Sequence, residues 1–213
     1  MADCLMADFA DFVLAWLPPA PARVLEVGCG REGGVVAELV AAGYDVLGID
    51  PNAPDGDRFL RETFQAAAPS LGSFDAAVAG RMLHHVDPLG EAVDLLAGLA
   101  PRLIVDEFAW EAIDPAAQAW YERRHAELAA AGASPGGPPT LDEWRWRHPG
   151  LHQSDTVLAA LRDRYDDLAF EPLPYLHHWL GPDTEAEERA LVEGGTIPPI
   201  GWRWAGTLAA DRR

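Results

Sequence analysis

The chain has 213 residues, enough for one sizeable domain with a hydrophobic core and too few for two of ordinary size. Its 16 basic residues, all arginine, face 34 acidic residues, which gives a formal net charge of −18. Binding nucleic acid requires clustered cations, so this balance argues against a nucleic-acid partner, and the lack of lysine excludes lysine Schiff-base chemistry. The apolar runs are too short for a membrane span and the N-terminal segment is acidic, unlike a signal peptide, so we expect a cytoplasmic protein.

The first half of the chain alternates predicted helices and strands. Apolar positions at helical spacing predict a helix over 5–17, which the Pro18-Pro19 pair ends. The elements expected after it are a strand at 23–27, a helix at 32–42, a strand at 44–49, a weak strand near 59–64, a strand at 74–79, a helix at 89–99 and a strand at 103–108. Strands and helices that alternate in this way predict an α/β fold, with a sheet covered on both faces.

The character of the sequence changes after Trp110. The expected elements are helices at 114–131, 140–147 and 154–166, a strand near 168–177, a helix at 184–193 and a closing strand at 202–208. The Pro/Gly stretch at 133–140 predicts a loop or hinge, and 133–153 is a candidate lid. Seven of the eight tryptophans lie in this part of the chain, which indicates either a pocket for an aromatic acceptor or a dimer interface.

The stretch VLEVGCGREGG, residues 24–34, fits a nucleotide-binding loop. Gly28, Gly30 and Gly33 match a dinucleotide pattern, and Asp50 ends the next strand, where an acid can accept the ribose hydroxyls. Glu26 argues against a dinucleotide, because a pyrophosphate is anionic and a buried carboxylate needs a cationic partner. The loop therefore favours a nucleoside ligand with an ammonium group and a sulfonium centre.

Three stretches within 22–110 together resemble the class I S-adenosylmethionine-dependent methyltransferases: VLEVGCG, SFDAAVAGRMLHHVDP and LAPRLIVDEF. The resemblance implies a Rossmann-like, doubly wound, seven-stranded and mostly parallel sheet, with a helical lid or insert between the fifth and sixth strands. It also implies a single domain over 1–213, with a cofactor-binding core at about 22–110, an acceptor-side helical insert at about 111–166 and closing strands at about 167–208. DEFAWEAIDPAAQAWY and EERALVEGGTIPPIGWRWAGTL resemble small bacterial methyltransferases found beside secondary-metabolite genes.

Carried over residue by residue, the resemblance assigns a cofactor site. The residues expected to bind S-adenosylmethionine are Glu26, Gly28, Cys29 and Gly30 at the methionine portion, Asp50 at the ribose, Pro51, Asn52 and Glu62 at the adenine, and Gly80 and Arg81 below the cofactor. The family usually has a third glycine where this chain has Glu32. We interpret Glu32 as an acid that the N-terminal end of a helix favours, with an alternative in which Glu32 or Arg31 adjusts how the methionine end is held.

Candidate groups for acid–base chemistry follow the fourth and fifth strands and the Pro/Gly stretch. They are His84, Glu107, His148 and His152; His85 receives less weight than His84. No acids accompany His148 and His152 at ligand spacing, so we expect no metal site. His177 and His178 lie in a strand-like run and are expected to alternate between the two faces of the sheet.

The sequence therefore predicts a methyltransferase that uses S-adenosylmethionine and a small, aromatic or apolar, natural-product-like acceptor, with oxygen the first expectation for the accepting atom and nitrogen the second. We expect no nucleic-acid or membrane partner, and a monomer or homodimer. One alternative is a protein that binds the cofactor without transferring methyl groups, or uses it for other chemistry. A nicotinamide-dependent reductase is disfavoured by Glu26 and by the lack of a lysine for a Tyr-x-x-x-Lys pair.

Overall fold

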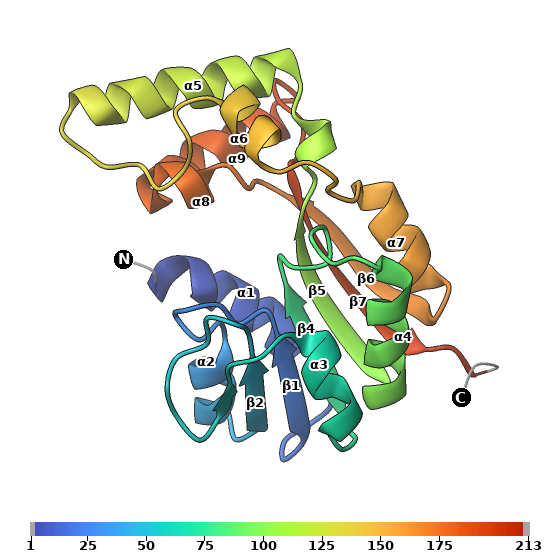
Figure 1. Cartoon of the computed structure of the whole chain (residues 1–213). Coiled ribbons are helices and arrows are strands. Elements are labelled where there is room, and N and C mark those ends of the chain that lie inside the picture. Colours follow the sequence, from blue (N-terminus) through green and yellow to red (C-terminus); the bar gives the residue numbers. More distant parts are fainter. Residues whose placement is uncertain (1–2, 211–213) are drawn as a thin grey trace.

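One seven-stranded sheet organises the part of the chain that the computed structural model describes, residues 3–210, with side chains described from residue 9 onward (Figure 1). The strands are β1 (Arg23–Val27), β2 (Asp45–Ile49), β3 (Phe59–Leu60), β4 (Ala76–Gly80), β5 (Arg102–Phe108), β6 (Tyr165–Leu173) and β7 (Gly201–Leu208). Their order is β3-β2-β1-β4-β5-β7-β6, and β7 is antiparallel to both neighbours while the other pairs are parallel. The predicted Rossmann-like, mostly parallel sheet is confirmed.

Helices cover both faces of the sheet, which explains why the central strands are continuous apolar runs. One face packs against α1 (Asp3–Trp16) and α2 (Val36–Ala41), where Phe9 and Val13 meet Val24 of β1. The other face packs against α3 (Phe64–Ala67), α4 (Leu89–Leu99) and α7 (Ser154–Arg162). Because side chains alternate along a strand, Glu26 of β1 points to the α1–α2 face with Val24.

A helical layer lies beyond the carboxyl ends of the parallel strands (Figure 1). It contains α5 (Pro115–Ala130), α6 (Leu141–Arg147), α8 (His177–Leu180) and α9 (Glu185–Glu193), and we call it the cap. A separate apolar core holds the cap together, with Phe108, Tyr121 and Trp144 among its buried members. The predicted insert between the fifth and sixth strands is present, and the segment between β6 and β7 contributes α8 and α9 to the same layer.

Several boundaries differ from those expected. The helix after the glycine loop begins at Val36 rather than 32, because residues 31–35 form turns. The run at His177–Leu180 is helical, so the expectation of a strand there is wrong. The helix α7 ends at Arg162, and β6 begins three residues later. Short 3-10 helices complete the fold: η1 (Ala68–Ser70), η2 (Trp110–Ala112) and η3 (Pro182–Thr184).

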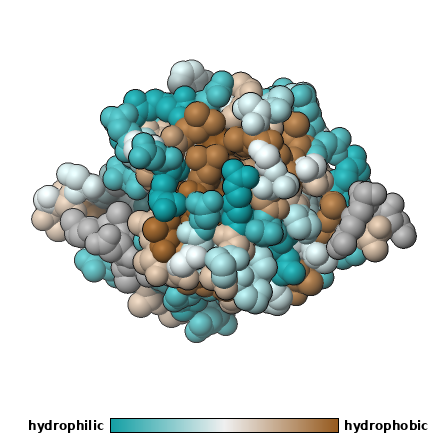
Figure 2. All heavy atoms as spheres, turned by 90° about the horizontal axis from the view of Figure 1, so that it is seen from below, coloured by the Kyte–Doolittle hydropathy of each residue, from teal (hydrophilic) through white to brown (hydrophobic). Residues whose placement is uncertain are grey.

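The surface opposite the cap interleaves hydrophilic and hydrophobic residues (Figure 2). Among the described residues the large apolar side chains that are exposed are Trp146, Leu168 and Phe170, and the last two lie on the edge strand β6. Within the same residues no helix combines the length and the apolar character needed to cross a bilayer. Most tryptophans after residue 109 are core residues: Trp202 and Trp204 pack in the sheet, and Trp144 packs in the cap.

Candidate functional site

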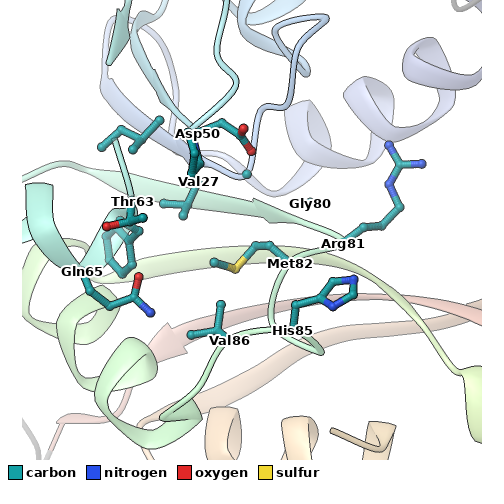
Figure 3. A pocket seen from close by; sticks show the side chains of 13 residues that line it. Val27, Asp50, Thr63, Gln65, Gly80, Arg81, Met82, His85 and Val86 are labelled. Carbon is teal, nitrogen blue, oxygen red and sulfur yellow. The ribbon is translucent and has the colours of Figure 1, made fainter. Parts of the chain in front are cut away.

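The strand-end cavity, of about 340 Å³, opens at the carboxyl ends of β1, β2 and β4 (Figure 3). Its lining residues are Val27, Gly28, Ile49, Asp50, Pro51, Thr63, Phe64, Gln65, Gly80, Arg81, Met82, His85 and Val86. Asp50 and Thr63 lie on one side, and Met82, Val86 and His85 lie on the other (Figure 3). Ligands of open α/β sheets bind at this edge, so the position fits the expected nucleoside.

The glycine-loop cavity, of about 530 Å³, adjoins it on the α1 side. Its lining residues are Phe9, Glu26, Gly28, Cys29, Gly30, Arg31, Glu32, Gly33, Gly34, Ala37, Glu38, Phe59, Gly80, Arg81, Asp106, His178 and Arg203. Gly28, Gly80 and Arg81 line both cavities, so the two meet where β1 and β4 end. Six of the predicted cofactor-binding residues lie around this second cavity. The sequence prediction missed Asp106, His178 and Arg203, which come from β5, the cap and β7.

Glu26 lies beneath the glycine loop. Its two carboxylate oxygens each lie 3.0 Å from the backbone nitrogen of Val35, which donates to them, and the side chain is buried. Burial raises the pKa of Glu26 to about 8, with the Val35 hydrogen bond opposing that rise. A carboxyl group of this kind favours a cationic neighbour, as the sequence argument expected.

Gly34 shows why the loop needs a glycine after Gly33. Its φ is +58°, and a Cβ at Gly34 would lie 1.9 Å from Oε1 of Glu26. The loop can therefore fold over the carboxylate only where a side chain is absent. Glu32 is exposed at the rim of the cavity, four residues before α2 begins, so it does not belong to the first turn of a helix as expected.

The ribose candidate Asp50 ends β2 and is oriented by its neighbour, because its Oδ1 accepts the Asn52 backbone N–H at 2.7 Å. Pro51 lines the strand-end cavity, whereas Asn52 and Glu62 are exposed and line neither cavity. The residues that line the cavity beyond Glu62 are Thr63, Phe64 and Gln65. Spacing alone could not fix this register, because β3 is only two residues long.

Cys29 lines the glycine-loop cavity as a thiol. Burial, followed by Glu26 and Asp50, raises the pKa of Cys29 to about 12. The Cys29 side chain therefore contributes its small size to the loop rather than a nucleophile.

Arg81 stands at the junction of the two cavities in a strained backbone conformation. Its φ of +52° is left-handed, which non-glycine residues rarely adopt. The Arg81 backbone N–H donates to the Asp106 carbonyl at 2.6 Å, and its Nε lies 3.6 Å from Oδ2 of Asp106. Arg203 holds the other oxygen of the Asp106 carboxylate, with Nε 3.2 Å from Oδ1. Strain that surrounding contacts maintain is typical of functional sites.

Glu107 holds the loop that follows β4. Its carboxylate accepts the backbone N–H groups of Leu83 at 2.6 Å and Phe108 at 3.0 Å, and the Nδ1–H of His84 at 2.5 Å. Both His84 and Glu107 are buried. Glu107 therefore orients the His84 ring, with Nδ1 toward the carboxylate and Nε2 on the other side of the ring.

The histidine that lines the strand-end cavity is His85. Its ring centroid is 4.1 Å from that of His84 and 5.8 Å from that of His148. Burial, followed by the two histidines, lowers the pKa of His85 to about 4, so its imidazole is neutral at pH 7. The sequence placed His84 ahead of His85, because it does not show that His84 is buried against Glu107 while His85 lines the cavity.

His148 and His152 belong to the segment that joins the cap to α7. His148 stacks on Trp144, and its Nδ1–H donates to the Trp144 carbonyl at 2.8 Å. The backbone N–H of His152 donates to the His84 carbonyl at 3.0 Å, and its Nε2 lies 2.8 Å from the Val86 carbonyl. His152 thus connects this segment to the turn that follows β4. The His148 ring lies near the ring of His85, which lines the strand-end cavity. The described residues contain no group of three or more His, Cys, Asp or Glu side chains that could hold a metal ion.

A family model described as a methyltransferase domain matches residues 2–131. The chain belongs to this methyltransferase family. The prediction from sequence, a class I S-adenosylmethionine-dependent methyltransferase, is confirmed at the level of family and fold. The two cavities lie at the carboxyl ends of the parallel strands, the edge at which open α/β sheets bind their ligands.

Individual relatives are distant. A ubiquinone biosynthesis O-methyltransferase from Xanthomonas axonopodis pv. citri is 37% identical over 94 residues, which cover 37% of this chain and 38% of the relative. A methyltransferase structure from Mesorhizobium loti, described as S-adenosylmethionine dependent, matches with a TM-score of 0.56 and 18% identity over 95% of this chain and 99% of that one. A putative methyltransferase of the same description from Listeria monocytogenes has a TM-score of 0.60 and 12% identity, over 96% of this chain and 98% of that one. The structural matches support the fold alone.

Proposed function

We propose that this protein transfers a methyl group from S-adenosylmethionine to a small-molecule acceptor, with oxygen the preferred accepting atom and nitrogen the second. The observation that carries the proposal is the pair of adjoining cavities at the strand ends, one holding Asp50 and the other Glu26. A carboxylate in each cavity matches a ligand with ribose hydroxyls at one end and an ammonium group at the other.

The residues present fit the cofactor. The Asp50 carboxylate accepts the ribose hydroxyls, and Pro51 and Thr63 flank the adenine in the strand-end cavity. The buried Glu26 faces the cationic methionine portion above Gly28 and Gly30. When bound, S-adenosylmethionine supplies an electrophilic methyl group on a sulfonium centre. The sulfonium and ammonium charges complement the net charge of −18 of the chain. They also favour the ionised form of Glu26, whose pKa is raised by burial.

The histidine cluster supplies the base for a hydroxyl acceptor. The neutral imidazole of His85 would accept the proton of the acceptor hydroxyl, while the bound cofactor would supply the methyl group and leave as S-adenosylhomocysteine. His84 and Glu107 position the turn that carries His85, and His148 lies beside His85 on the cap side. Transfer of this kind depends chiefly on alignment of the reacting atoms, which the cap and the β4 turn provide.

The acceptor class follows from the cavity walls. Phe9 and Phe59 line the glycine-loop cavity, and Met82 lines the strand-end cavity, so an aromatic or apolar small molecule fits between them. None of the tryptophans after residue 109 lines either cavity; most of them pack in the cores, and Trp146 is exposed. A natural-product-like acceptor remains part of the proposal.

The test measures S-adenosylhomocysteine formed from S-adenosylmethionine with phenol, catechol and aromatic amine acceptors. We expect turnover with a hydroxyl acceptor, and an Asp50→Ala variant with at least about tenfold weaker cofactor binding because it loses hydrogen bonds to a charged group. Asp45→Ala, at the exposed start of the same strand, is the matched control and should bind normally.

Unchanged cofactor affinity in Asp50→Ala would contradict the proposed site, as would binding of NADH in place of S-adenosylmethionine. Cofactor binding with no turnover of any acceptor would instead indicate a protein that binds the cofactor without catalysis.

A further inference from the structure

Two His-His pairs in this chain share one arrangement. In the first pair, buried Glu107 holds His84, and His85 lines the strand-end cavity. In the second, buried Glu188 accepts the Nδ1–H of His177 at 2.8 Å, and His178 lines the glycine-loop cavity. The first histidine of each pair is fixed by a carboxylate and the second is presented to a cavity.

The second pair belongs to the cap. The Glu188 carboxylate is fully buried and accepts the backbone N–H groups of Tyr175, Leu176 and His177, each at 2.8 Å. Together with the bond from His177 Nδ1–H, these three backbone hydrogen bonds fix the start of α8 and hence the position of His178. The cap thereby places the His178 side chain at the glycine-loop cavity.

His178 has an unused nitrogen in a positive environment. Its Nε2 is buried and has no hydrogen-bond partner among the described residues. Burial, followed by Arg81, His177 and Arg203, lowers the pKa of His178 to about 2, so its ring is neutral and lies near the cationic side chains of Arg81 and Arg203. A buried polar atom without a partner costs free energy unless a ligand satisfies it.

Arg81 faces the same space. Its guanidinium extends away from the centre of the strand-end cavity (Figure 3), and it lines the glycine-loop cavity together with His178. Its contact with Asp106, at 3.6 Å, is longer than that of Arg203, at 3.2 Å, and about a third of the Arg81 side chain is exposed. The Tyr175 hydroxyl lies beside the Arg81 guanidinium and stays protonated, because burial raises its pKa.

We propose that Arg81 and His178 together bind a carboxylate group of the acceptor, so that the preferred acceptors are small hydroxylated aromatic acids. This inference rests on the proposed function and specifies its acceptor. The carboxylate accepts from the guanidinium of Arg81 and from Nε2–H of His178, which satisfies the orphaned nitrogen. Anchored by Arg81, which lines both cavities, the acceptor directs its hydroxyl toward the strand-end cavity and His85.

The experiment is calorimetry of the protein loaded with S-adenosylhomocysteine, with 4-hydroxybenzoate and 4-hydroxybenzamide as probes. We expect the acid to bind at least about tenfold more tightly than its amide, the effect of one charge-assisted hydrogen-bond pair. Arg81→Met and His178→Phe should each reduce that ratio to below about threefold. Arg31→Met removes the same charge from the exposed rim of the same cavity and should keep the ratio.

Acids that bind no tighter than their amides, or a ratio that survives in both Arg81→Met and His178→Phe, overturn the inference. So does a loss of S-adenosylhomocysteine affinity in Arg81→Met while 5′-methylthioadenosine binds normally, because Arg81 would then hold the carboxylate of the cofactor. The measurement needs no turnover, so failure of the proposed methyl transfer is recognised separately, by the absence of S-adenosylhomocysteine formation from S-adenosylmethionine with every acceptor.

Discussion

At the scale of single residues, Glu26 is the side chain that we propose links the glycine loop to the cofactor. Its carboxylate accepts a hydrogen bond from the Val35 N–H and lies under Gly34. One side chain thus shapes the loop and determines the charge beneath it. The position could be predicted from sequence, because an acid two residues before a glycine loop on a buried strand has few partners. Its contact with Val35 could not, since it depends on turns at 31–35 that no periodicity shows.

We expect Glu26→Gln to weaken binding of S-adenosylhomocysteine by at least about tenfold, because the amide cannot carry the charge that the ammonium group needs. Glu32→Gln, at the exposed rim, is the matched control and should change affinity by less than about threefold. Calorimetry of the two variants makes the comparison, and an effect below about threefold for Glu26→Gln would mean that its carboxylate does not face the cofactor.

The same carboxyl group predicts a pH dependence. Since the pKa of Glu26 is raised to about 8, its unliganded form is mostly protonated at neutral pH, and a bound cation favours ionisation. Cofactor affinity should therefore rise with pH from about 6 to about 8 in the unchanged protein and lose this rise in Glu26→Gln. Parallel pH profiles in the two proteins would assign the titration to another group.

At the scale of elements, the sequence predicted the type and order of almost every helix and strand because periodic burial dictates them. The exceptions were α3 at Phe64–Ala67, which was not predicted, and the run at His177–Leu180. The alternating pattern of the His177–Leu180 run suggested a strand. The Glu188 carboxylate of α9 instead accepts the backbone N–H groups of Tyr175 and His177, and a helix begins there. A partner eleven residues downstream in sequence overrode the local pattern, which is why the second histidine pair and the cap-borne His178 were missed.

Gly34→Ala tests the packing of the loop element against β1. The new methyl group would meet Oε1 of Glu26 at 1.9 Å and impose a left-handed φ on alanine, so we expect a marked fall in thermal stability and loss of cofactor binding. Gly132→Ala also has a left-handed φ, +85°, but no atom within 4 Å, so it measures the backbone cost alone, about 1–2 kcal/mol. Equal melting temperatures for the two variants would show that the loop moves away from Glu26.

At the scale of the whole molecule, the net charge acts on ligands at long range, whereas the cap contributes local contacts. A net charge of −18 attracts a cationic cofactor and repels an acidic ligand at long range, so the acidic acceptor that we propose requires a local cation such as Arg81. Leu168 and Phe170 are exposed on the edge strand β6. The expectation of a monomer or homodimer stays a prediction.

Salt should separate these two effects. Raising the ionic strength from about 0.01 M to about 0.1 M shortens the screening length from about 30 Å to about 10 Å. We expect S-adenosylmethionine to associate more slowly and an aromatic carboxylate more quickly, as measured by stopped-flow tryptophan fluorescence. Rates that change in the same direction for both ligands would mean that local contacts, rather than the overall charge, govern association.

The sequence by itself determined the alternating α/β order, the glycine loop, Glu26 and Asp50, because each follows from local periodicity or from short spacing along neighbouring strands. The tertiary structure alone decided which side chains share a cavity. Arg81 directly follows β4, Asp106 and Arg203 lie on β5 and β7, and His178 belongs to the cap. Only the sheet order β4-β5-β7 and the folding of two separate segments into one cap bring them together. No local pattern encodes those distances, because they arise from pairing between strands about a hundred residues apart.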